Sequence, residues 1–274
     1  MEAPQKSWWP YKTITLENGK QVYKKYSMAP IIIILVLIAM YFAADMTGFK
    51  LKTLLTRGDE FFVILRRMFP PNLKFINKVL PPLLDTIKMS VLGTIIGAVL
   101  SIPIALLAAQ NISHSIFVSS IMKFFLSFIR TMPTLVTALI LTYIFGLGTF
   151  AGTLAIAIFT FSFVGKQLYE AIEASDLSPY EAMESLGANK IKSFMAAIVP
   201  QVLPAFLSVS LYTFEGNVRH AAILGYVGAG GIGILLNENI AWRDYENVGT
   251  ILLCLLVTVA MIETLSRYLR KKLS

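Results

Sequence analysis

The sequence predicts an all-α integral membrane protein, a polytopic bundle of about six transmembrane helices. Two observations support this fold class. Of the 274 residues, 56% are hydrophobic and only 15% are charged, and the mean hydropathy of +0.68 lies outside the range of soluble domains. The apolar residues also gather into runs of roughly twenty, the length that a helix needs to cross a bilayer.

Charge and cysteine content narrow the class of protein further. The net charge of +8 comes from basic residues in loops and near the chain ends, a distribution that favours anionic lipid over nucleic acid as the partner. The one cysteine, Cys254, lies in an apolar run, where a small buried hydrophobe is expected. We therefore expect no intramolecular disulfide, no metal site and no nucleic-acid partner.

The first 85 residues predict a tail, one span and an amphipathic segment. Residues 1–28 are basic and aromatic, which is typical of a tail that ends at a membrane interface. The apolar run that follows predicts a transmembrane helix over 29–45. Residues 46–85 mix apolar and basic residues and contain two proline pairs, which predicts an amphipathic segment between the first and second spans.

A core over 86–268 and a basic tail over 269–274 follow. The second span is rich in glycine, alanine and serine, the small residues that let membrane helices approach closely. The five spans of the core are expected at 86–109, at 124–145, at 149–165, from Val202 onward, and at 248–265.

Arg130 falls about two turns inside the third span of the chain, the one expected at 124–145. A charge at that depth costs roughly 2.5–3.5 kcal/mol unless it faces protein or water. We weigh two interpretations of this side chain. It either contacts an anion or gates the pathway, or it extends toward the cytoplasmic interface to meet a structural carboxylate or carbonyl.

The fifth span of the chain, which begins at Val202, contains four polar side chains in a stretch of six residues: Glu215, Asn217, Arg219 and His220. They cannot all face lipid, so they line a cavity, a partner or a subunit interface. Glu215 and Arg219 are four residues apart and share a helix face. They either neutralise one another or contact a substrate, and both hold if Glu215 orients an Arg219 that binds an anion.

A glycine run follows the polar cluster. It lacks the GK[ST] ending of a P-loop and follows no strand, so no nucleotide site is predicted. We expect either a bent, close-packed or re-entrant element near the pathway, or a flexible loop. The glycines concerned are Gly228, Gly230, Gly231 and Gly233.

The polar interval 177–200 predicts two short helices with a tight corner between them. Ser178 and Pro179 indicate a helix start, Glu181 completes a capping box, and Gly187 indicates the helix end. These residues alone are also explained if Glu181 is only a capping partner at the helix start and Gly187 only ends the helix. A second helix is expected next, with an apolar stripe at Ile191, Phe194, Met195 and Ile198.

The spacing of Glu181, Ala182 and Met183, then Gly187 and then Pro200 resembles the EAA loop of binding-protein-dependent ABC importer permeases of the type I (MetI-like) fold. Met183 stands where that family usually has alanine. The later run FEGNVRHAAILGYVGAGGIG is similar to the phosphonate-importer permeases within the family. The resemblance implies that the interval is a cytoplasmic coupling loop that docks on an ATPase subunit.

The resemblance further implies a non-catalytic permease subunit of an ATP-driven importer for phosphonates or related phosphorus oxyanions, with Arg130 and Arg219 as candidate anion contacts. The chain has no Walker A signature, so ATP and Mg²⁺ would be bound by the partner and no cofactor by this chain. The implied partners are a second permease copy, two ATP-binding subunits, an extracytoplasmic solute-binding protein and the lipid bilayer.

The implied location is the bacterial cytoplasmic membrane. Counting six spans from a cytoplasmic coupling loop places both chain ends in the cytoplasm. The same count places residues 46–85 outside, although their basic residues are unusual for that face.

Three alternatives stay open. An importer of phosphate, phosphite or an amino acid such as methionine would share this architecture. An ion channel would conduct without ATP. A membrane enzyme acting on lipid phosphates needs a catalytic set, and the sequence brings together no clustered histidines, DxxD-type carboxylates or Ser-His-Asp set.

Overall fold

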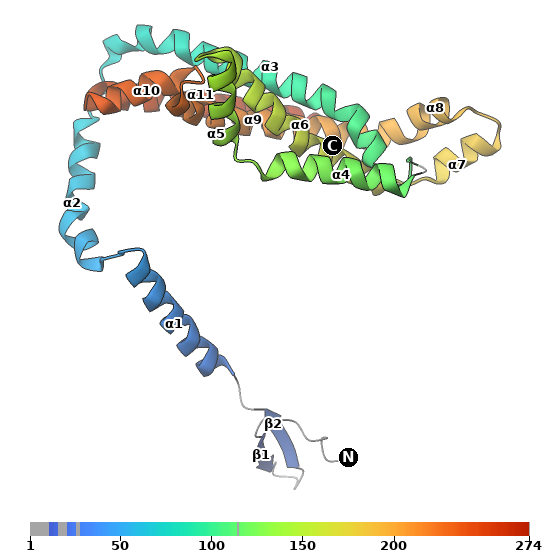
Figure 1. The fold of residues 1–274 in the computed structure, drawn as a ribbon, viewed down its shortest axis with the longest axis horizontal. Helices are drawn as coiled ribbons and strands as arrows, with labels where there is room; N and C mark the ends of the chain where they lie inside the picture. Colours follow the sequence, from blue (N-terminus) through green and yellow to red (C-terminus); the bar gives the residue numbers. More distant parts are fainter. Residues whose placement is uncertain (1–10, 16–20, 26–27, 114, 274) are drawn as a thin grey trace. The chain divides into compact units, whose positions relative to one another are not determined.

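The computed structural model describes residues 11–15, 21–25, 28–113 and 115–273. It confirms the helical membrane bundle and adds a feature that was not predicted, an antiparallel pair of strands, β1 (Tyr11–Thr15) and β2 (Gln21–Lys25). The rest of the expected tail over 1–28 lies almost entirely outside the described residues. The chain divides into two units, residues 1–63 and 64–274, and each is described by itself (Figure 1).

The first unit contains the predicted first span. Helix α1 (Ala29–Met46) is apolar on every side, and none of its side chains is buried. Most of α2 (Leu51–Arg67) also belongs to this unit. That helix is amphipathic, with one apolar side and one polar side on which basic residues outnumber acidic ones. Its exposed apolar side chains include Leu51, Leu54, Leu55, Phe62 and Leu65.

The second unit is a bundle of long helices (Figure 1). Helices α3, α6, α9 and α11 pack side by side, and α7 and α8 extend beyond one end of the bundle. In chain order the elements are η1 (Leu73–Phe75), α3 (Ile76–Ala108), α4 (Ile116–Thr131), α5 (Thr134–Phe145), α6 (Thr149–Glu173), α7 (Ser178–Ser185), α8 (Lys190–Ser193), η2 (Phe194–Ile198), α9 (Val199–Leu224), η3 (Gly225–Val227), α10 (Ile232–Ala241) and α11 (Tyr245–Leu273).

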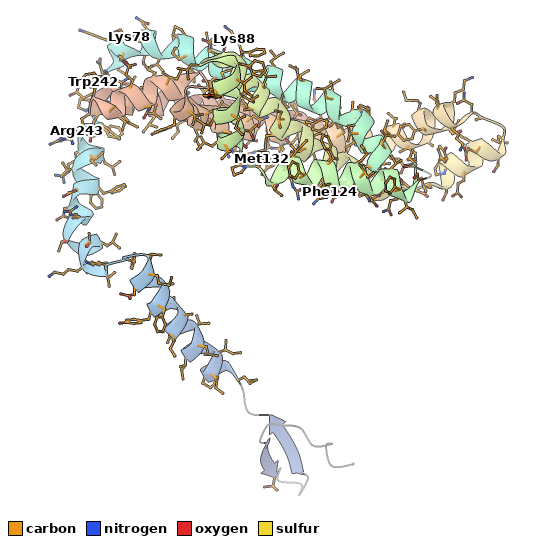
Figure 2. All side chains as sticks on the ribbon, viewed as in Figure 1. Lys78, Lys88, Phe124, Met132, Trp242 and Arg243 are labelled. Atoms are coloured by element: carbon orange, nitrogen blue, oxygen red, sulfur yellow. The ribbon has the colours of Figure 1, made fainter. Side chains whose placement is uncertain are left out.

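The third span was predicted as one helix. It consists instead of two helices, α4 and α5, with a bend of 85° between them. The bend lies at Met132, which is labelled in Figure 2. Pro133 has no N–H to continue the helical ladder, and its ring forces the residue before it out of the helical region. Met132 accordingly has an extended ψ of 122°.

Hydrogen bonds at the two ends of the bundle indicate that α4 and α5 together cross it once. At one end the turn after α3 is joined to the end of α6, because Asn111 Nδ2 donates to the carbonyl of Ile172. At the other end the residues before α6 meet the glycine run, because Gly148 N–H donates to the carbonyl of Gly228. With the bent pair counted as one, the described residues contain six apolar spans.

One predicted boundary was wrong. Helix α3 begins at Ile76, about ten residues before the expected start, and includes Pro81 and Pro82. The hydroxyl of Thr86 donates to the carbonyl of Pro82 (2.8 Å), four residues earlier in the same helix. Helix α6 contains the fourth predicted span and extends beyond its expected end at Gly165 to Glu173.

The prediction that small residues mediate close packing is confirmed between α3 and α6. A Cβ atom on Gly97 would lie 2.4 Å from the carbonyl oxygen of Ala157, and one on Gly93 would lie 2.9 Å from that of Thr153. Both contacts are with backbone that cannot move aside. The two helices therefore approach as closely as they do only because these positions lack side chains.

Candidate functional site

The segment 177–200, the predicted coupling loop, begins with a cap that differs from the predicted one. Ser178 lies inside α7, and its hydroxyl donates to Asp176 Oδ1 (2.7 Å) instead of capping the helix. The same carboxylate oxygen accepts the N–H of Ser178 (2.9 Å). These two bonds hold the pKa of Asp176 below its usual range. The aspartate two residues before the serine is the signal of such a turn in the sequence.

Gly187 ends α7, as the sequence predicted. It adopts φ +85°, and its N–H donates to the carbonyl of Glu184 (2.9 Å) while the N–H of Ala188 donates to the carbonyl of Met183 (3.1 Å). This pair of bonds is the Schellman arrangement. A Cβ atom at Gly187 would meet open space, so the left-handed backbone, not crowding, is what favours glycine here.

The second half of the loop is continuous with the next span, which corrects the prediction of a separate short helix. Asn189 begins α8 by accepting from the N–H groups of Ile191 (2.8 Å) and Lys192 (3.1 Å). The chain then passes through a π-helical turn, η2, into α9. Pro200, in the first turn of α9, has no N–H to donate, and the widened turn lies directly before it.

The side chain of Gln201 closes the base of the loop, and the sequence analysis did not single it out. Its Nε2 donates to the carbonyls of Asp176 (3.0 Å) and Ala197 (2.8 Å), and its Oε1 accepts the N–H of Asp176 (3.0 Å). One amide thus joins the start of the loop to α9. We call these residues, Asp176 and Gln201, the loop neck.

The apolar residues of the loop divide into an inner and an outer set. Tyr180 and Phe194 pack against the core formed by α3, α4, α6 and α9, and Ile198 is fully buried within it. The predicted stripe therefore divides between the two sets. The outer set, which we call the outer face of the loop, is Leu186 (88% exposed), Ile191 (73%) and Met195 (59%). Glu181 and Ala182 are also exposed, and Met183 is half-buried.

The predicted ion pair in α9 is present, and α11 extends it. Glu215 Oε1 lies 2.5 Å from a terminal guanidinium nitrogen of Arg219. Glu215 is buried, and its second oxygen lies 3.5 Å from Arg270 of α11. A buried carboxylate needs such cations, because desolvation otherwise favours its neutral form.

A second carboxylate joins this network. Glu263 of α11 lies 3.6 Å from Arg219 and 2.6 Å from Arg267. The network of Glu215, Arg219, Glu263, Arg267 and Arg270 thus has three cations for two anions. This network is visible only once α9 and α11 pack together, although the spacing of Glu263, Arg267 and Arg270 along α11 indicates that they share one face of that helix.

A cavity of about 300 Å³ lies beside this network, between α6 and α9. Arg219 lines it with half of its side chain exposed. His220 lines it too, packs edge-on against the ring of Phe159, and has an Nδ1 atom without a hydrogen-bond partner among the described residues. The cavity thus offers one cation and one imidazole nitrogen, groups that recognise an oxyanion. The lining residues are Phe159, Phe163, Tyr212, Thr213, Glu215, Gly216, Arg219 and His220.

The structure does not bring Asn217 to this cavity. Its side chain is fully buried on another side of α9, where Nδ2 donates to the hydroxyls of Thr94 in α3 and Thr160 in α6, both at 2.8 Å. Arg130 is separate as well. It is exposed in the last turn of α4 and makes no hydrogen bond or ion pair with another residue that the structure describes.

The glycine run is a bent, close-packed element rather than a flexible loop. Gly228, Gly230 and Gly231 have positive φ, and a Cβ atom on Gly233 would lie 2.0 Å from the carbonyl oxygen of Ala222. The run is tied to α3, because the hydroxyl of Thr86 accepts the N–H of Ile232 (2.8 Å). Short helix α10 follows, and its turn into α11 carries Trp242 and Arg243, labelled in Figure 2.

Comparison with known proteins finds one family over most of the bundle. The family described as "Binding-protein-dependent transport system inner membrane component" matches residues 101–274. The phosphate-import permease protein PhnE of Mycolicibacterium smegmatis is 38% identical over 211 residues, which are 77% of this chain and 40% of that protein. The chain therefore spans less than half of that relative's length.

A second relative matches over most of its length. The phosphite transport system permease protein PtxC of Stutzerimonas stutzeri is 34% identical over 219 residues, 80% of each chain. The fold also matches a chain of the MetNI methionine ABC transporter in an inward-facing conformation, with a TM-score of 0.65, 18% identity, and coverage of 74% of this chain and 99% of that one. The chain thus belongs to the family of binding-protein-dependent transport system inner membrane components.

Proposed function

We propose that the chain is the transmembrane permease of an ATP-driven importer for phosphonates or related phosphorus oxyanions such as phosphite and phosphate. Two relatives bear the names of phosphate-import and phosphite transport permeases. The observation that carries the substrate class is Arg219, a half-exposed guanidinium in a cavity within a membrane span. A guanidinium matches the oxygens of a phosphorus oxyanion through paired hydrogen bonds.

Glu215 tunes this arginine for a transient contact. It takes one guanidinium nitrogen and so fixes the orientation of Arg219, while the surplus cation of the network keeps the cavity attractive to an anion. A permease needs this balance, because a substrate bound too tightly would not leave the pathway. The binding protein, not the permease, then supplies most of the selectivity.

In this proposal the ATPase partner acts on the permease through the coupling loop. The outer face of the loop presents Leu186, Ile191 and Met195 where an isolated protein would expose polar residues, which supports docking of a partner subunit there. The partner would be an ATPase, with one copy on each of two permease chains, and an extracytoplasmic binding protein would deliver the substrate. ATPase closure would move the loops and switch access across the membrane.

This assignment sets the orientation in the bacterial cytoplasmic membrane. A cytoplasmic loop and six spans place both chain ends in the cytoplasm and α2 outside. Helix α2 then suits a position along the membrane surface, with its apolar side in the lipid and its basic side on the head groups. Such a position accounts for the basic residues of α2 on the outer face.

The substrate class is tested by reconstituting the permease with its ATPase and binding protein in vesicles. We expect methylphosphonate, phosphite or phosphate to raise ATP turnover and to accumulate inside, and methionine to do neither. Stimulation by methionine and not by any of the three oxyanions would refute the substrate assignment and leave the fold unaffected.

The role of Arg219 is tested with Arg219→Gln against Arg267→Gln, since both arginines pair with Glu263. Losing a charge-assisted hydrogen bond of 1.5–3 kcal/mol predicts about tenfold or more slower oxyanion uptake for Arg219→Gln, with substrate-independent ATP turnover retained. The control arginine is largely exposed, so its change should alter uptake less than about twofold. Equal effects of the two changes would exclude a substrate contact.

A further inference from the structure

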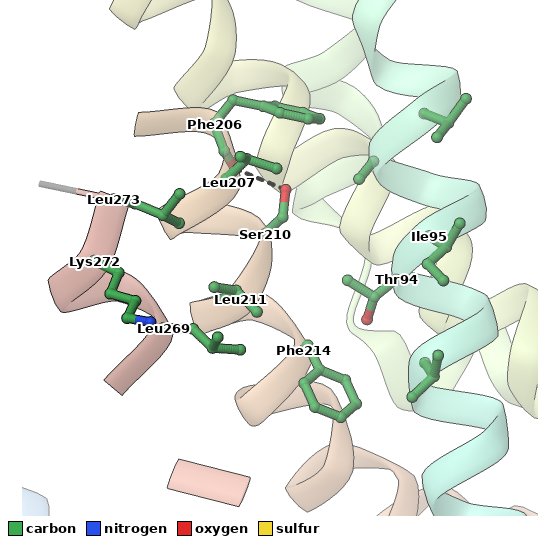
Figure 3. Close-up of a pocket in the computed structure, with 13 residues that line it drawn as sticks. Thr94, Ile95, Phe206, Leu207, Ser210, Leu211, Phe214, Leu269, Lys272 and Leu273 are labelled. Atoms are coloured by element: carbon green, nitrogen blue, oxygen red, sulfur yellow. Dashed lines mark hydrogen bonds between the residues drawn. The ribbon is translucent and has the colours of Figure 1, made fainter. Parts of the chain in front are cut away.

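A second cavity, of about 670 Å³, opens on a different side of the bundle and takes no part in the proposed transport function (Figure 3). Helix α9 forms its floor, α3 one wall and the last turns of α11 the other. We call it the lateral groove. Its lining comprises Val91, Thr94, Ile95, Ala98, Val99, Phe206, Leu207, Ser210, Leu211, Phe214, Leu269, Lys272 and Leu273.

Apart from the ammonium group of Lys272, the groove offers apolar surface and no open hydrogen-bonding group. Both hydroxyls in the lining are already engaged. Thr94 Oγ1 donates to the carbonyl of Ser90 (2.6 Å) and accepts from Asn217, and Ser210 Oγ donates to the carbonyl of Phe206 (2.8 Å). An occupant of the groove must therefore be an apolar chain. The one charged side chain in the lining is that of Lys272, from α11 (Figure 3).

The groove faces away from the polar network. Ser210 and Arg219 are nine residues apart on α9, which is two and a half turns at about 3.6 residues per turn, so they lie on opposite sides of the helix. Arg219 belongs to the cavity between α6 and α9, whereas Ser210 belongs to the lateral groove. In a membrane bundle the side opposite a polar pathway is the side toward lipid.

We propose that the lateral groove binds one anionic phospholipid, with an acyl chain between α3, α9 and α11 and the phosphate at Lys272. The groove extends along α3 from Val91 to Val99, about 12 Å at 1.5 Å per residue. One leaflet contributes roughly half of the 30 Å hydrocarbon thickness. The groove thus runs nearly the depth of one leaflet, with a cation at the basic end of α11 to meet the head group.

A helix fits the groove less well than an acyl chain does. Helix α1 is apolar all round and has no buried side chain, but its 18 residues extend about 27 Å. A binding site for the whole of α1 would need an exposed apolar surface more than twice as long as this groove.

The test measures lipid retained by the full-length protein purified in detergent with a mixture of phosphatidylglycerol and phosphatidylcholine. Native mass spectrometry of the wild type should show one phosphatidylglycerol per chain, retained at least fivefold over phosphatidylcholine. Ser210→Trp, which fills the groove, should reduce retention of both lipids at least fivefold. Leu256→Trp, on an exposed part of α11 outside the groove, should leave retention unchanged.

Lys272→Gln should abolish the preference for phosphatidylglycerol while the acyl site remains, and Lys271→Gln, the exposed neighbour outside the groove, should preserve it. If Ser210→Trp fails to fold, Ile95→Trp on the facing wall serves in its place. Equal retention by all variants, or no retained lipid in the wild type, would overturn the proposal. A disulfide between Ser210→Cys and Leu37→Cys would overturn it too, by assigning the groove to α1.

Discussion

Asn217 joins three helices at one point inside the bundle. Its amide donates to one hydroxyl on α3 and another on α6, and no part of the residue is exposed. No water competes for these bonds there, and interhelical hydrogen bonds of this kind contribute about 0.6–2 kcal/mol in membrane proteins. The residue thus fixes where α9 sits against its neighbours, while Arg219, two positions on, lines the cavity.

We predict that Asn217→Ala lowers the free energy of unfolding by about 1–2 kcal/mol, because both hydroxyl partners lose a donor. Asn237→Ala is the matched control, since the Asn237 side chain on α10 makes no hydrogen bond with the residues that the structure describes. Unfolding in mixed micelles with increasing denaturing detergent measures both. Equal stability of the two variants would show that the amide has no structural part.

The charged residues of the network show what the sequence reveals and what it does not. Glu215 and Arg219 could be paired from their spacing, because four residues on one helix fix their separation. Arg270 could not be added, since it comes from a helix 55 residues later and meets Glu215 only once α9 and α11 pack. The inward direction of Asn217 depended likewise on α3, which lies 123 residues earlier.

At the scale of elements, the loop neck is the contact through which, in the proposed function, movement of the loop reaches the bundle. The Gln201 amide holds Asp176 to α9, so the two ends of the loop move together. Without that clamp, no hydrogen bond among the described residues would join the connection at 174–177 to α9. Force on the outer face of the loop would then be lost in bending that connection.

We predict that Gln201→Ala lowers substrate-stimulated ATP turnover at least threefold in the reconstituted transporter, with ATPase binding preserved because the outer face is unchanged. Gln110→Ala is the control, an exposed glutamine at the same end of the bundle whose backbone, not side chain, makes the recorded bond. If Gln201→Ala also abolishes ATPase binding, the residue serves the fold of the loop and not the transmission of movement.

The glycine run gives a second prediction at this scale. Gly233→Ala should destabilise the protein by about 1–3 kcal/mol, because its new Cβ would overlap the backbone of α9. Gly216→Ala is the control, since a Cβ there meets nothing within 4 Å. Thermal unfolding of the purified variants distinguishes them, and an equal fall in both melting temperatures would contradict the close packing of α9 and α10.

Over the whole molecule, the sequence predicts well what depends on local patterns. The apolar runs predicted six spans, because hydropathy is a property of a short segment. Gly187 predicted the end of α7, because a left-handed backbone is a property of a single position. The bend before Pro133 was not predicted, because the limits of that span were set by hydropathy alone, although a proline is a local signal of a helix break. The cap at Asp176 was missed for a different reason, because Asp176 and Ser178 both offer a side-chain oxygen that can accept a backbone N–H at a helix start.

The account as a whole rests on the coupling loop lying on the cytoplasmic side, where an ATPase can reach it. The most direct test places a cysteine at the exposed Ser185, with the native Cys254 replaced by alanine, and adds a membrane-impermeant thiol reagent. We predict no labelling in intact cells and full labelling in inside-out vesicles. Labelling of intact cells would place the loop outside and contradict the account.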